Sequence, residues 1–259
     1  MRRCVALLAL VAGLLVGCGD SAPASPRGAK VLRMTIDSDA VGRKLPLRIV
    51  IPSGGGERPL LVFLHGKGMS ATSFLVDPFY KALAELGARA PIVAFPSGGD
   101  HSYWHDRADG DWGRYVIKEV IPQVTERSGA DGDRVAIGGI SMGGFGAYDL
   151  ARLNPGRFCG VGGHSPALWR TAGETAPGAF DDAADFERHD VVGDGRRLRD
   201  ERLWLDAGDG DPFIPGARAF SATADVKLRL MAGGHNSDYW NRNWARYLRF
   251  YARSLKDCD

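Results

Sequence analysis

The stretch Gly139-Ile140-Ser141-Met142-Gly143 places a serine in the pattern G-x-S-x-G. Before it, Val135-Ala136-Ile137 is a short apolar run typical of a buried strand. After it, apolar residues recur at helical spacing until Asn154-Pro155-Gly156. A strand, a sharp turn and a helix in this order present a serine hydroxyl as a nucleophile, because the turn pushes the side chain out at the carboxyl end of a sheet. The alternative is a glycine-rich turn in which Ser141 only caps the helix.

A serine nucleophile needs a base, and the base needs an acid that orients it. His235 stands in Gly233-Gly234-His235-Asn236, just after the strand-like run 226–230, and we predict that it is the base. His65 is also a candidate, but it precedes the serine in the chain and directly follows the apolar run 60–64. We interpret His65 as a residue that braces its own loop.

Three aspartates at the end of the strand-like run 203–207 compete for the role of the acid. Asp206 still lies within the run, so we interpret it as a packed strand residue. Asp209 and Asp211 both follow the strand, where glycines at 208 and 210 allow a sharp rise of the backbone. Pro212 fixes the backbone directly after Asp211, so we predict Asp211 as the acid and Asp209 as a turn residue.

Further residues fall on loops that should border the reacting centre. His65-Gly66-Lys67-Gly68 follows one buried run, and His164 follows another. We expect the substrate to be contacted by residues of these loops and of the polar loop 97–111, namely His65, Gly66, Gly68, Trp104 and His164. The spacing of the aspartates in the loop 97–111 fits no metal-binding template, so we expect neither a metal site nor a cofactor.

The elements needed to position these residues can be read from the periodicity. Apolar runs predict eight strands, and apolar positions at helical spacing predict five helices. The strands are expected near 31–36, 45–51, 60–64, 92–96, 135–137, 158–163, 203–208 and 226–230. The helices are expected near 74–86, 112–127 and 143–153, after Phe213 as far as 222, and near 239–255. Alternating strands and helices imply an α/β fold with a mostly parallel sheet covered on both faces, and ligands bind at the carboxyl edge of such a sheet. The polar stretch 170–200 is expected to form a small cap over that edge, and Pro122 should kink the second helix.

Composition narrows the class of protein. The chain has 259 residues, a net charge of +2 and 44% hydrophobic residues, which suit one globular domain. A charge so close to zero gives no support for binding nucleic acid.

The N-terminus resembles an export signal. A basic start is followed by twelve apolar residues, 5–16, a length typical of a signal-peptide core and too short to span a bilayer. Leu15-Val16-Gly17-Cys18 resembles a bacterial lipobox, which predicts a signal peptide at 1–17, a lipid on Cys18, a flexible tether at 18–30 and a domain at 31–259. The expected location is the outer face of the cell membrane. The alternative is ordinary secretion with cleavage after Ala22-Pro23-Ala24.

Two cysteines remain in the expected domain. Cys159 opens a strand that runs towards the active edge of the sheet, whereas Cys258 ends a helix of about 20 residues that runs about 30 Å in the opposite direction. Both should therefore lie at the amino edge, and an exported chain permits a disulfide between them. Two free thiols are the alternative.

Taken together, residues 31–255 resemble α/β hydrolases of the esterase D type, a group that includes feruloyl esterases and mycolyltransferases. The resemblance depends on five stretches in a fixed order, namely Leu64-His65-Gly66, Glu119-Val120-Ile121-Pro122, Gly139-Ile140-Ser141-Met142-Gly143-Gly144, Asp211-Pro212-Phe213, and Gly233-Gly234-His235 with Tyr239-Trp240. It implies a catalytic triad of Ser141, Asp211 and His235. It also implies an oxyanion hole formed by the backbone N–H groups of Met142 and Lys67, with Gly68 as the alternative to Lys67.

The resulting hypothesis is an exported serine esterase that acts on a small-molecule or glycolipid ester. One alternative is an acyltransferase, in which a sugar or glycerol hydroxyl replaces water. Another is an inactive hydrolase fold used for binding at the cell surface, against which the complete set of serine, aspartate and histidine argues. The acyl chain, the alcohol and the oligomeric state are not determined by the sequence.

Overall fold

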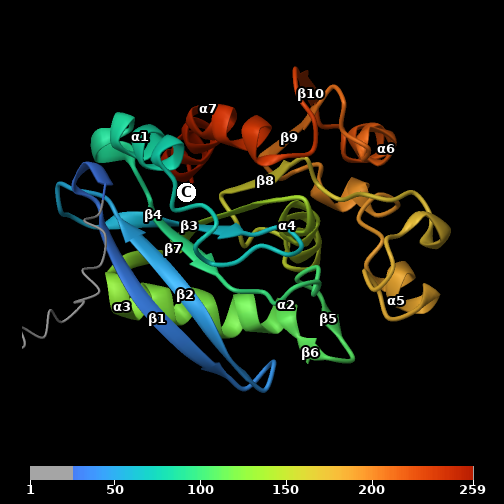
Figure 1. Ribbon diagram of the computed structural model, residues 1–259, viewed down its shortest axis with the longest axis horizontal. Coiled ribbons are helices and arrows are strands. Elements are labelled where there is room, and N and C mark those ends of the chain that lie inside the picture. The colour runs from blue at the N-terminus through green and yellow to red at the C-terminus, as the bar shows by residue number, and fades with distance from the viewer. Residues whose placement is uncertain (1–25, 259) are drawn as a thin grey trace, which may run out of the picture.

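An eight-stranded sheet forms the centre of the computed structural model, which describes residues 26–258 (Figure 1). The strand order is β1-β2-β4-β3-β7-β8-β9-β10. The strands are β1 (Lys30–Ser38), β2 (Arg43–Ile51), β3 (Arg58–Leu64), β4 (Ile92–Pro96), β7 (Ala130–Ile140), β8 (Gly160–His164), β9 (Leu203–Gly208) and β10 (Leu228–Met231). A separate two-stranded ribbon joins β5 (Asp106–Arg107) to β6 (Gly110–Asp111).

The predicted fold class is confirmed. The strands β4, β3, β7, β8, β9 and β10 pair in parallel, whereas β1 pairs with β2 and β2 pairs with β4 in antiparallel register. Parallel neighbours bring their carboxyl ends to one edge, so the loops after β3, β7, β8 and β9 all leave from the same edge. That edge positions the candidate site.

Alternation along the strands divides the core into two layers. In β3, Leu60, Val62 and Leu64 pack on one face, whereas Leu61 and Phe63 pack on the other. The second face is covered by α1 (Asp77–Glu85) and α7 (Ser237–Lys256), and the first by the remaining long helices. These are α3 (Ile121–Ser128), α4 (Met142–Leu153) and α6 (Ile214–Ala224).

The helix expected over 112–127 forms in three pieces rather than as one kinked helix. A short α2 (Trp112–Arg114) leads into a π-helical segment, Tyr115–Val120, and α3 begins at Ile121. Pro122 therefore lies in the first turn of α3. The helix is continuous across this point, and the N–H of Ile121 donates to the carbonyl oxygen of Val116, five residues back, so a change in the hydrogen-bond pattern accompanies the proline.

The polar stretch between β8 and β9 forms an insertion, which Figure 1 shows beside the sheet (yellow to orange). Its regular part is short and includes α5 (Ala183–Arg188). The ring of Phe180 stacks on Tyr103 and lies edge-on to Phe145, so the insertion is attached to the loop after β4 and to α4 by aromatic packing.

The far end of α7 is tied to the sheet by a disulfide between Cys159 and Cys258, whose Cα atoms lie 5.3 Å apart. Cys159 immediately precedes β8, at the edge opposite the active loops. The geometry is the one expected from the opposite directions of β8 and α7.

The predicted signal peptide at 1–17 and the predicted lipid site at Cys18 lie outside the described residues, as does most of the predicted tether at 18–30. Among residues 26–258, no helix combines the length and the apolar character that crossing a bilayer requires.

Reduction of the disulfide is expected to lower the free energy of unfolding by about 2–4 kcal/mol, because the unfolded chain then regains the freedom of a long loop. The bond spans 99 residues of sequence. The melting midpoint should fall by about 5–15 °C for a domain of this size, measured by calorimetry with and without reductant. Cys258→Ser serves as the control and should melt low under both conditions. Equal midpoints for the oxidised wild type and Cys258→Ser would contradict the prediction.

Candidate active site

Ser141 occupies the sharp turn between β7 and α4, with φ 55° and ψ −116°. Positive φ is strained for a residue with a side chain, so the turn depends on the contacts that hold it. The N–H of Ser141 donates to the carbonyl oxygen of His164, and the N–H of Ala167 donates to the carbonyl oxygen of Ser141. The loop after β8 therefore fixes the turn from the side.

The glycines on either side of the turn are required by close packing. A Cβ atom at Gly139 would lie 2.4 Å from the carbonyl carbon of Gly143, and one at Gly143 would lie 2.1 Å from the carbonyl oxygen of Leu64. Both distances are far inside van der Waals contact. The pattern G-x-S-x-G in this chain therefore reflects the close approach of α4 to the ends of β7 and β3.

His235 lies within hydrogen-bonding distance of Ser141. Its Nε2 atom is 2.9 Å from Ser141 Oγ, and its Nδ1 atom is 2.9 Å from Asp211 Oδ2. A carboxylate only accepts hydrogen bonds, so Nδ1 carries the proton and Nε2 is free to accept the proton of the serine. The rings of Phe213 and Trp240 flank the imidazole at centroid distances of 5.0 and 5.2 Å.

The Asp211 side chain is fully buried, whereas that of His235 is 21% exposed. Burial alone would raise the pKa of Asp211. Two interactions outweigh this effect of burial. Asp211 accepts a hydrogen bond from His235 and interacts with its charge, and Asp211 Oδ1 accepts the N–H of Phe213 at 2.8 Å. Together they hold the pKa of Asp211 below its usual value. The carboxylate is therefore ionised at neutral pH and can stabilise an imidazolium at His235.

The other two aspartates have different partners. Asp209 Oδ1 accepts the N–H of Gly233 at 3.0 Å, which braces the turn before His235. Asp206 is buried in β9 and accepts hydrogen bonds from Tyr239, Tyr247, Trp204 and His164. The structure thus brings Asp211 to the base and leaves Asp206 in the core and Asp209 in a turn, the arrangement that the sequence predicts.

Two backbone N–H groups are available for an oxyanion. Met142 is the first residue of α4, and the first N–H groups of a helix have no intrahelical partner. Among residues 26–258, the N–H of Lys67 also donates to no protein group, whereas that of Gly68 donates to the carbonyl oxygen of Asp100 at 3.0 Å. This difference favours Lys67 over Gly68. Gly66 lies against the nucleophile, since a Cβ there would be 3.4 Å from Ser141 Cβ.

The expectation that His65 and Trp104 contact the substrate is corrected. The side chain of His65 is buried, donating from Nδ1 to the carbonyl oxygen of Gly66 and accepting from the N–H of Gly98 at Nε2. Burial lowers its pKa to about 4, so the ring is neutral and braces the loop. Trp104 has no exposed surface and donates from Nε1 to the carbonyl oxygen of His65. Trp104 therefore supports the loop of His65 from the interior of the protein instead of lining a pocket.

The expectation for His164 is corrected in the same way. Its side chain has no exposed surface, because the end of β8 is covered by α7. Nδ1 lies 2.7 Å from Asp206 Oδ1, Nε2 lies 2.8 Å from the hydroxyl of Tyr251, and the ring stacks on Tyr247 at 3.6 Å. All polar atoms of the ring are used within the core, so His164 cannot reach a substrate.

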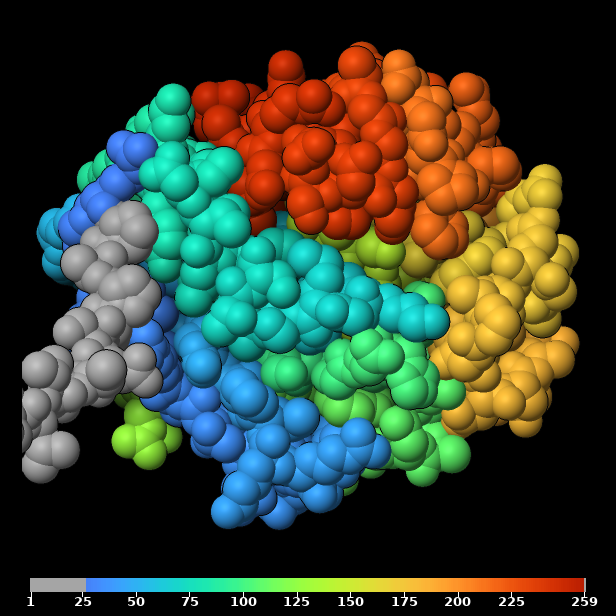
Figure 2. Space-filling model, in the orientation of Figure 1, coloured from blue at the N-terminus to red at the C-terminus, as the bar shows by residue number. Residues whose placement is uncertain are grey.

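Phe213 and Trp240 were not singled out as site residues by the sequence. Both belong to stretches that carry the resemblance, which was the available signal. A groove of about 300 Å³ runs beside Phe213 and is also lined by Trp169, Arg170 and Glu174. Figure 2 shows the yellow-green middle of the chain recessed between the teal loop after β3, the red α7 and the orange-yellow insertion. In the part of the chain that the structure describes, the triad belongs to no group of three side chains that could hold a metal ion.

Comparison with known proteins agrees with this geometry. A family model described as "Putative esterase" matches residues 38–246. A diacylglycerol acyltransferase/mycolyltransferase, Ag85A of Mycobacterium ulcerans, is 26% identical over 277 residues, which cover 90% of this chain and 81% of the relative.

Two solved structures share the fold. A ferulic acid esterase superposes with a TM-score of 0.74 at 22% identity, covering 87% of this chain and 98% of that one. An S-formylglutathione hydrolase from Agrobacterium tumefaciens gives a TM-score of 0.73 at 18% identity, covering 88% and 96%. Since the family model spans most of the chain and the fold is that of the α/β hydrolases, the chain belongs to the "Putative esterase" family.

Proposed function

We propose that this protein is an exported serine hydrolase that cleaves a carboxylic ester through an acyl-enzyme on Ser141. The observation that carries the proposal is the continuous hydrogen-bonded series from Ser141 through His235 to Asp211, with 2.9 Å at each step. A buried carboxylate, an oriented imidazole and a serine on a strained turn are the parts that activated serine nucleophiles share.

The reaction uses these groups in order. Ser141 Oγ bonds to the ester carbonyl carbon while His235 Nε2 takes the hydroxyl proton. The imidazolium then gives this proton to the alcohol oxygen as the carbon–oxygen bond breaks. A water molecule attacks the acyl-enzyme, and its proton passes by way of His235 to Ser141 as the acid leaves. Asp211 stays ionised throughout and keeps Nδ1 protonated.

The tetrahedral intermediate of each step carries its negative charge on the former carbonyl oxygen. We assign the N–H groups of Met142 and Lys67 as its donors, because neither has a protein partner among residues 26–258. The N-terminal end of α4 adds the positive end of the helix dipole. One such donor typically contributes about 3 kcal/mol to transition-state stabilisation.

A second candidate function is acyl transfer to a sugar or glycerol hydroxyl. The similarity to Ag85A over most of both chains favours this candidate. The triad would act in the same way, and the acceptor would replace water in the second half of the reaction. The groove beside Phe213 offers space for an acyl or acceptor group close to His235, because the rings of Phe213 and His235 are 5.0 Å apart.

Labelling by a fluorophosphonate probe is expected for the wild type and not for Ser141→Ala, because the probe reacts only with an activated serine. Hydrolysis of p-nitrophenyl esters, from acetate to palmitate, should depend on the same residue. Absence of label on a folded wild type would favour the inactive binding protein. In the presence of sugar or glycerol acceptors, product analysis separates the two enzymes: free acid identifies a hydrolase, and an acylated acceptor identifies a transferase.

Replacing each of the two loop aspartates by asparagine, one at a time, separates their roles. Asp211→Asn should lower kcat by about 10⁴, because an amide in place of the carboxylate permits the wrong tautomer of His235. Asp209→Asn, the matched control, should keep most of the activity, since Asp209 only accepts the N–H of Gly233. Steady-state kinetics at equal melting temperature provide the measurement. A large loss in Asp209→Asn combined with an active Asp211→Asn would reverse the assignment.

The proposed membrane anchor of the exported protein is a lipid on Cys18. Cys18→Ala should release the protein from the membrane fraction and abolish incorporation of a labelled fatty acid, because the thiol is the expected acylation site. Cys258→Ser, which lacks a thiol far from the N-terminus, should remain in the membrane fraction. A wild-type protein that carries no lipid would show that the chain is secreted without an anchor.

A further inference from the structure

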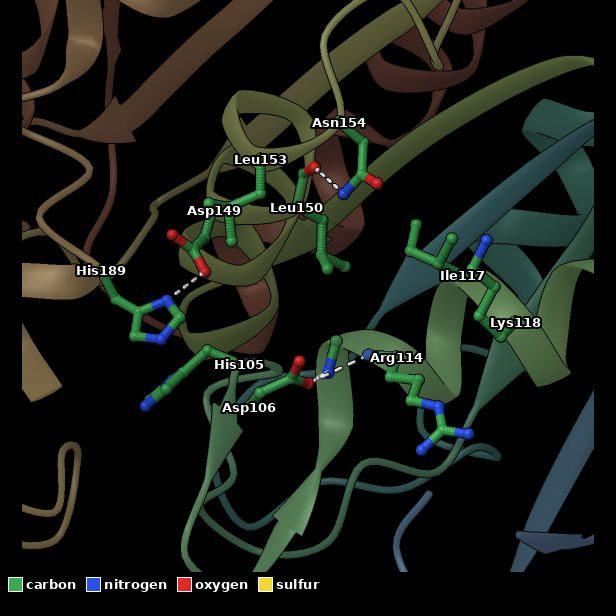
Figure 3. A pocket seen from close by; sticks show the side chains of 11 residues that line it. His105, Asp106, Arg114, Ile117, Lys118, Asp149, Leu150, Leu153, Asn154 and His189 are labelled. Carbon is green, nitrogen blue, oxygen red and sulfur yellow. Dashed lines mark hydrogen bonds and ion pairs between the residues drawn. The ribbon is translucent and has the colours of Figure 1, made fainter. Parts of the chain in front are cut away.

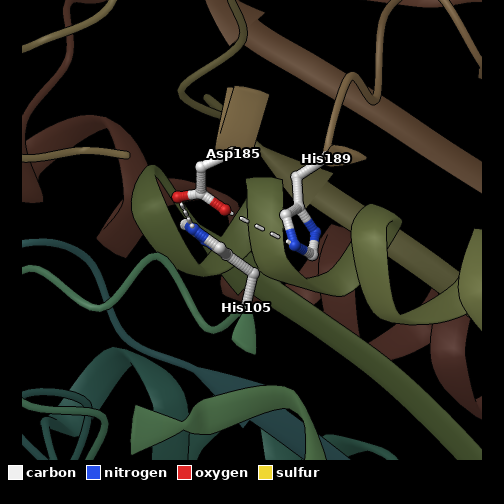
Figure 4. A group of neighbouring side chains, drawn as sticks. All are labelled: His105, Asp185 and His189. Carbon is white, nitrogen blue, oxygen red and sulfur yellow. Dashed lines mark hydrogen bonds and ion pairs between the residues drawn. The ribbon is translucent and has the colours of Figure 1, made fainter. Parts of the chain in front are cut away.

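A second cluster of titratable side chains lies outside the triad. His105, Asp185 and His189 are buried and face one another, as Figure 4 shows. His105 lies on the loop after β4, Asp185 lies in α5, and His189 is the residue that follows α5. One ligand atom from each residue can be chosen so that all three lie within 4.8 Å of one another.

The distances within this cluster are close to those of a metal site. His105 Nε2 lies 3.1 Å from Asp185 Oδ2, and His189 Nε2 lies 3.8 Å from Asp185 Oδ1. Zinc bonds of about 2.0–2.1 Å in a tetrahedron place neighbouring ligand atoms about 3.3 Å apart. These two pairs are within about 0.5 Å of that spacing. The two imidazoles, whose ligand atoms lie within 4.8 Å of each other, must also approach for all three residues to bind one ion.

His189 is oriented in the way that metal-binding histidines usually are. Its Nδ1 atom lies 2.8 Å from Asp149 Oδ2, and Asp149 is in turn held by Arg152. An ionised carboxylate accepts, so Nδ1 carries the proton and Nε2 presents its lone pair towards Asp185. A carboxylate that holds the far nitrogen of a ligand histidine is a common outer-shell arrangement.

His105 has an incomplete set of hydrogen bonds. Its side chain has no exposed surface, and Nδ1 has no partner among residues 26–258. Asp185 is better satisfied, because its carboxylate also accepts the N–H of Asp181 and a guanidinium N–H of Arg188. The atom that faces Asp185 is Nε2, so Nε2 is the candidate ligand atom, and the missing partner of Nδ1 does not itself mark an ion site.

A cavity of about 240 Å³ borders the cluster and is lined by His105 and His189, whereas Asp185 does not line it. Figure 3 shows His105, His189 and Asp149 on one side of it and Arg114 and Lys118 on the other. Because the side chains of His105 and Asp185 have no exposed surface, entry of a cation requires a local movement of these residues.

We propose that His105, Asp185 and His189 form a binding site for a divalent transition metal ion, with Zn²⁺ as the best match to two imidazoles and one carboxylate. The site is structural. It joins the loop after β4 to the insertion, and through Asp149 it joins both to α4. Since Trp104 precedes His105 and donates to the carbonyl oxygen of His65, bound metal would also stabilise the support of the oxyanion loop.

The test uses the full exported protein with His235→Gln, so that the catalytic imidazole cannot bind zinc. After chelation and removal of the chelator, calorimetric titration with Zn²⁺ should give one ion per chain, and elemental analysis after gel filtration should recover it. The melting midpoint should rise by about 5–10 °C at a free zinc concentration of 100 times Kd. Co²⁺ in place of Zn²⁺ should show the visible absorption of tetrahedral coordination.

Variants of Asp185 and His189 test whether the bound zinc ion lies at this cluster. Asp185→Asn and His189→Gln should each lower the affinity for zinc by at least about 10-fold, whereas His101→Gln, an exposed histidine of the same loop, should leave it unchanged. If the cluster variants do not fold, the titration and the Co²⁺ spectrum of the His235→Gln protein decide alone.

Two results would overturn the proposal. One is a His235→Gln protein that binds no zinc in the titration, which would leave the cluster as hydrogen-bonded pairs between carboxylates and imidazoles. The other is zinc binding with unchanged affinity in folded Asp185→Asn and His189→Gln. Neither result bears on the proposed esterase activity, which depends on Ser141.

Discussion

The strained backbone of Ser141 is the constraint on which the rest of the site depends. A non-glycine residue at positive φ costs about 1–3 kcal/mol and persists only where the surroundings hold it. Here the surroundings are the carboxyl ends of β3 and β7 and the first turn of α4, which meet so closely that neither Gly139 nor Gly143 could carry a side chain. The same close approach brings Gly66 against Ser141 and so places the loop of Lys67 beside the nucleophile.

The base is positioned by a different part of the chain. Asp209 braces the turn before His235, and Asp206 binds the hydroxyl groups of Tyr239 and Tyr247 on α7. These contacts fix the loop and the helix on either side of the imidazole, whereas Asp211 contacts the imidazole itself. Three acidic residues within six positions thus have three sets of partners, because Asp206 lies within β9 whereas Asp209 and Asp211 lie on the loop that follows it.

The core contains a second pairing of aspartate and histidine that resembles part of a triad. His164 and Asp206 are 2.7 Å apart, but both are fully buried and the other nitrogen of His164 contacts the hydroxyl of Tyr251. The pair anchors α7 on the sheet, and the disulfide at Cys258 holds the other end of the same helix. What distinguishes His235 from His164 is access: the side chain of His235 is 21% exposed at the active edge.

The sequence by itself determined the fold class and the turn at Ser141, and it singled out His235 and Asp211, which the structure places in one hydrogen-bonded series with Ser141. These follow from local signals. The signals concerned each involve only a few neighbouring residues: the periodicity of strands and helices, the glycines around Ser141, and the proline after Asp211. All three candidate aspartates were also interpreted as the geometry has them, since alternation along a strand separates Asp206 from the loop. The expected substrate contacts of His65, Trp104 and His164 were wrong, because the sequence near the end of a strand does not show which side chains the rest of the fold will bury.

Only the tertiary structure brought together groups with no local relation. His105 is 80 residues from Asp185, and the Asp149 that orients His189 lies on a third segment. Their meeting depends on how the insertion packs against α4, which is set by many weak aromatic and apolar contacts rather than by any motif. Local chemistry fixes what one segment can do, whereas the long-range packing of the folded chain decides which segments do it together.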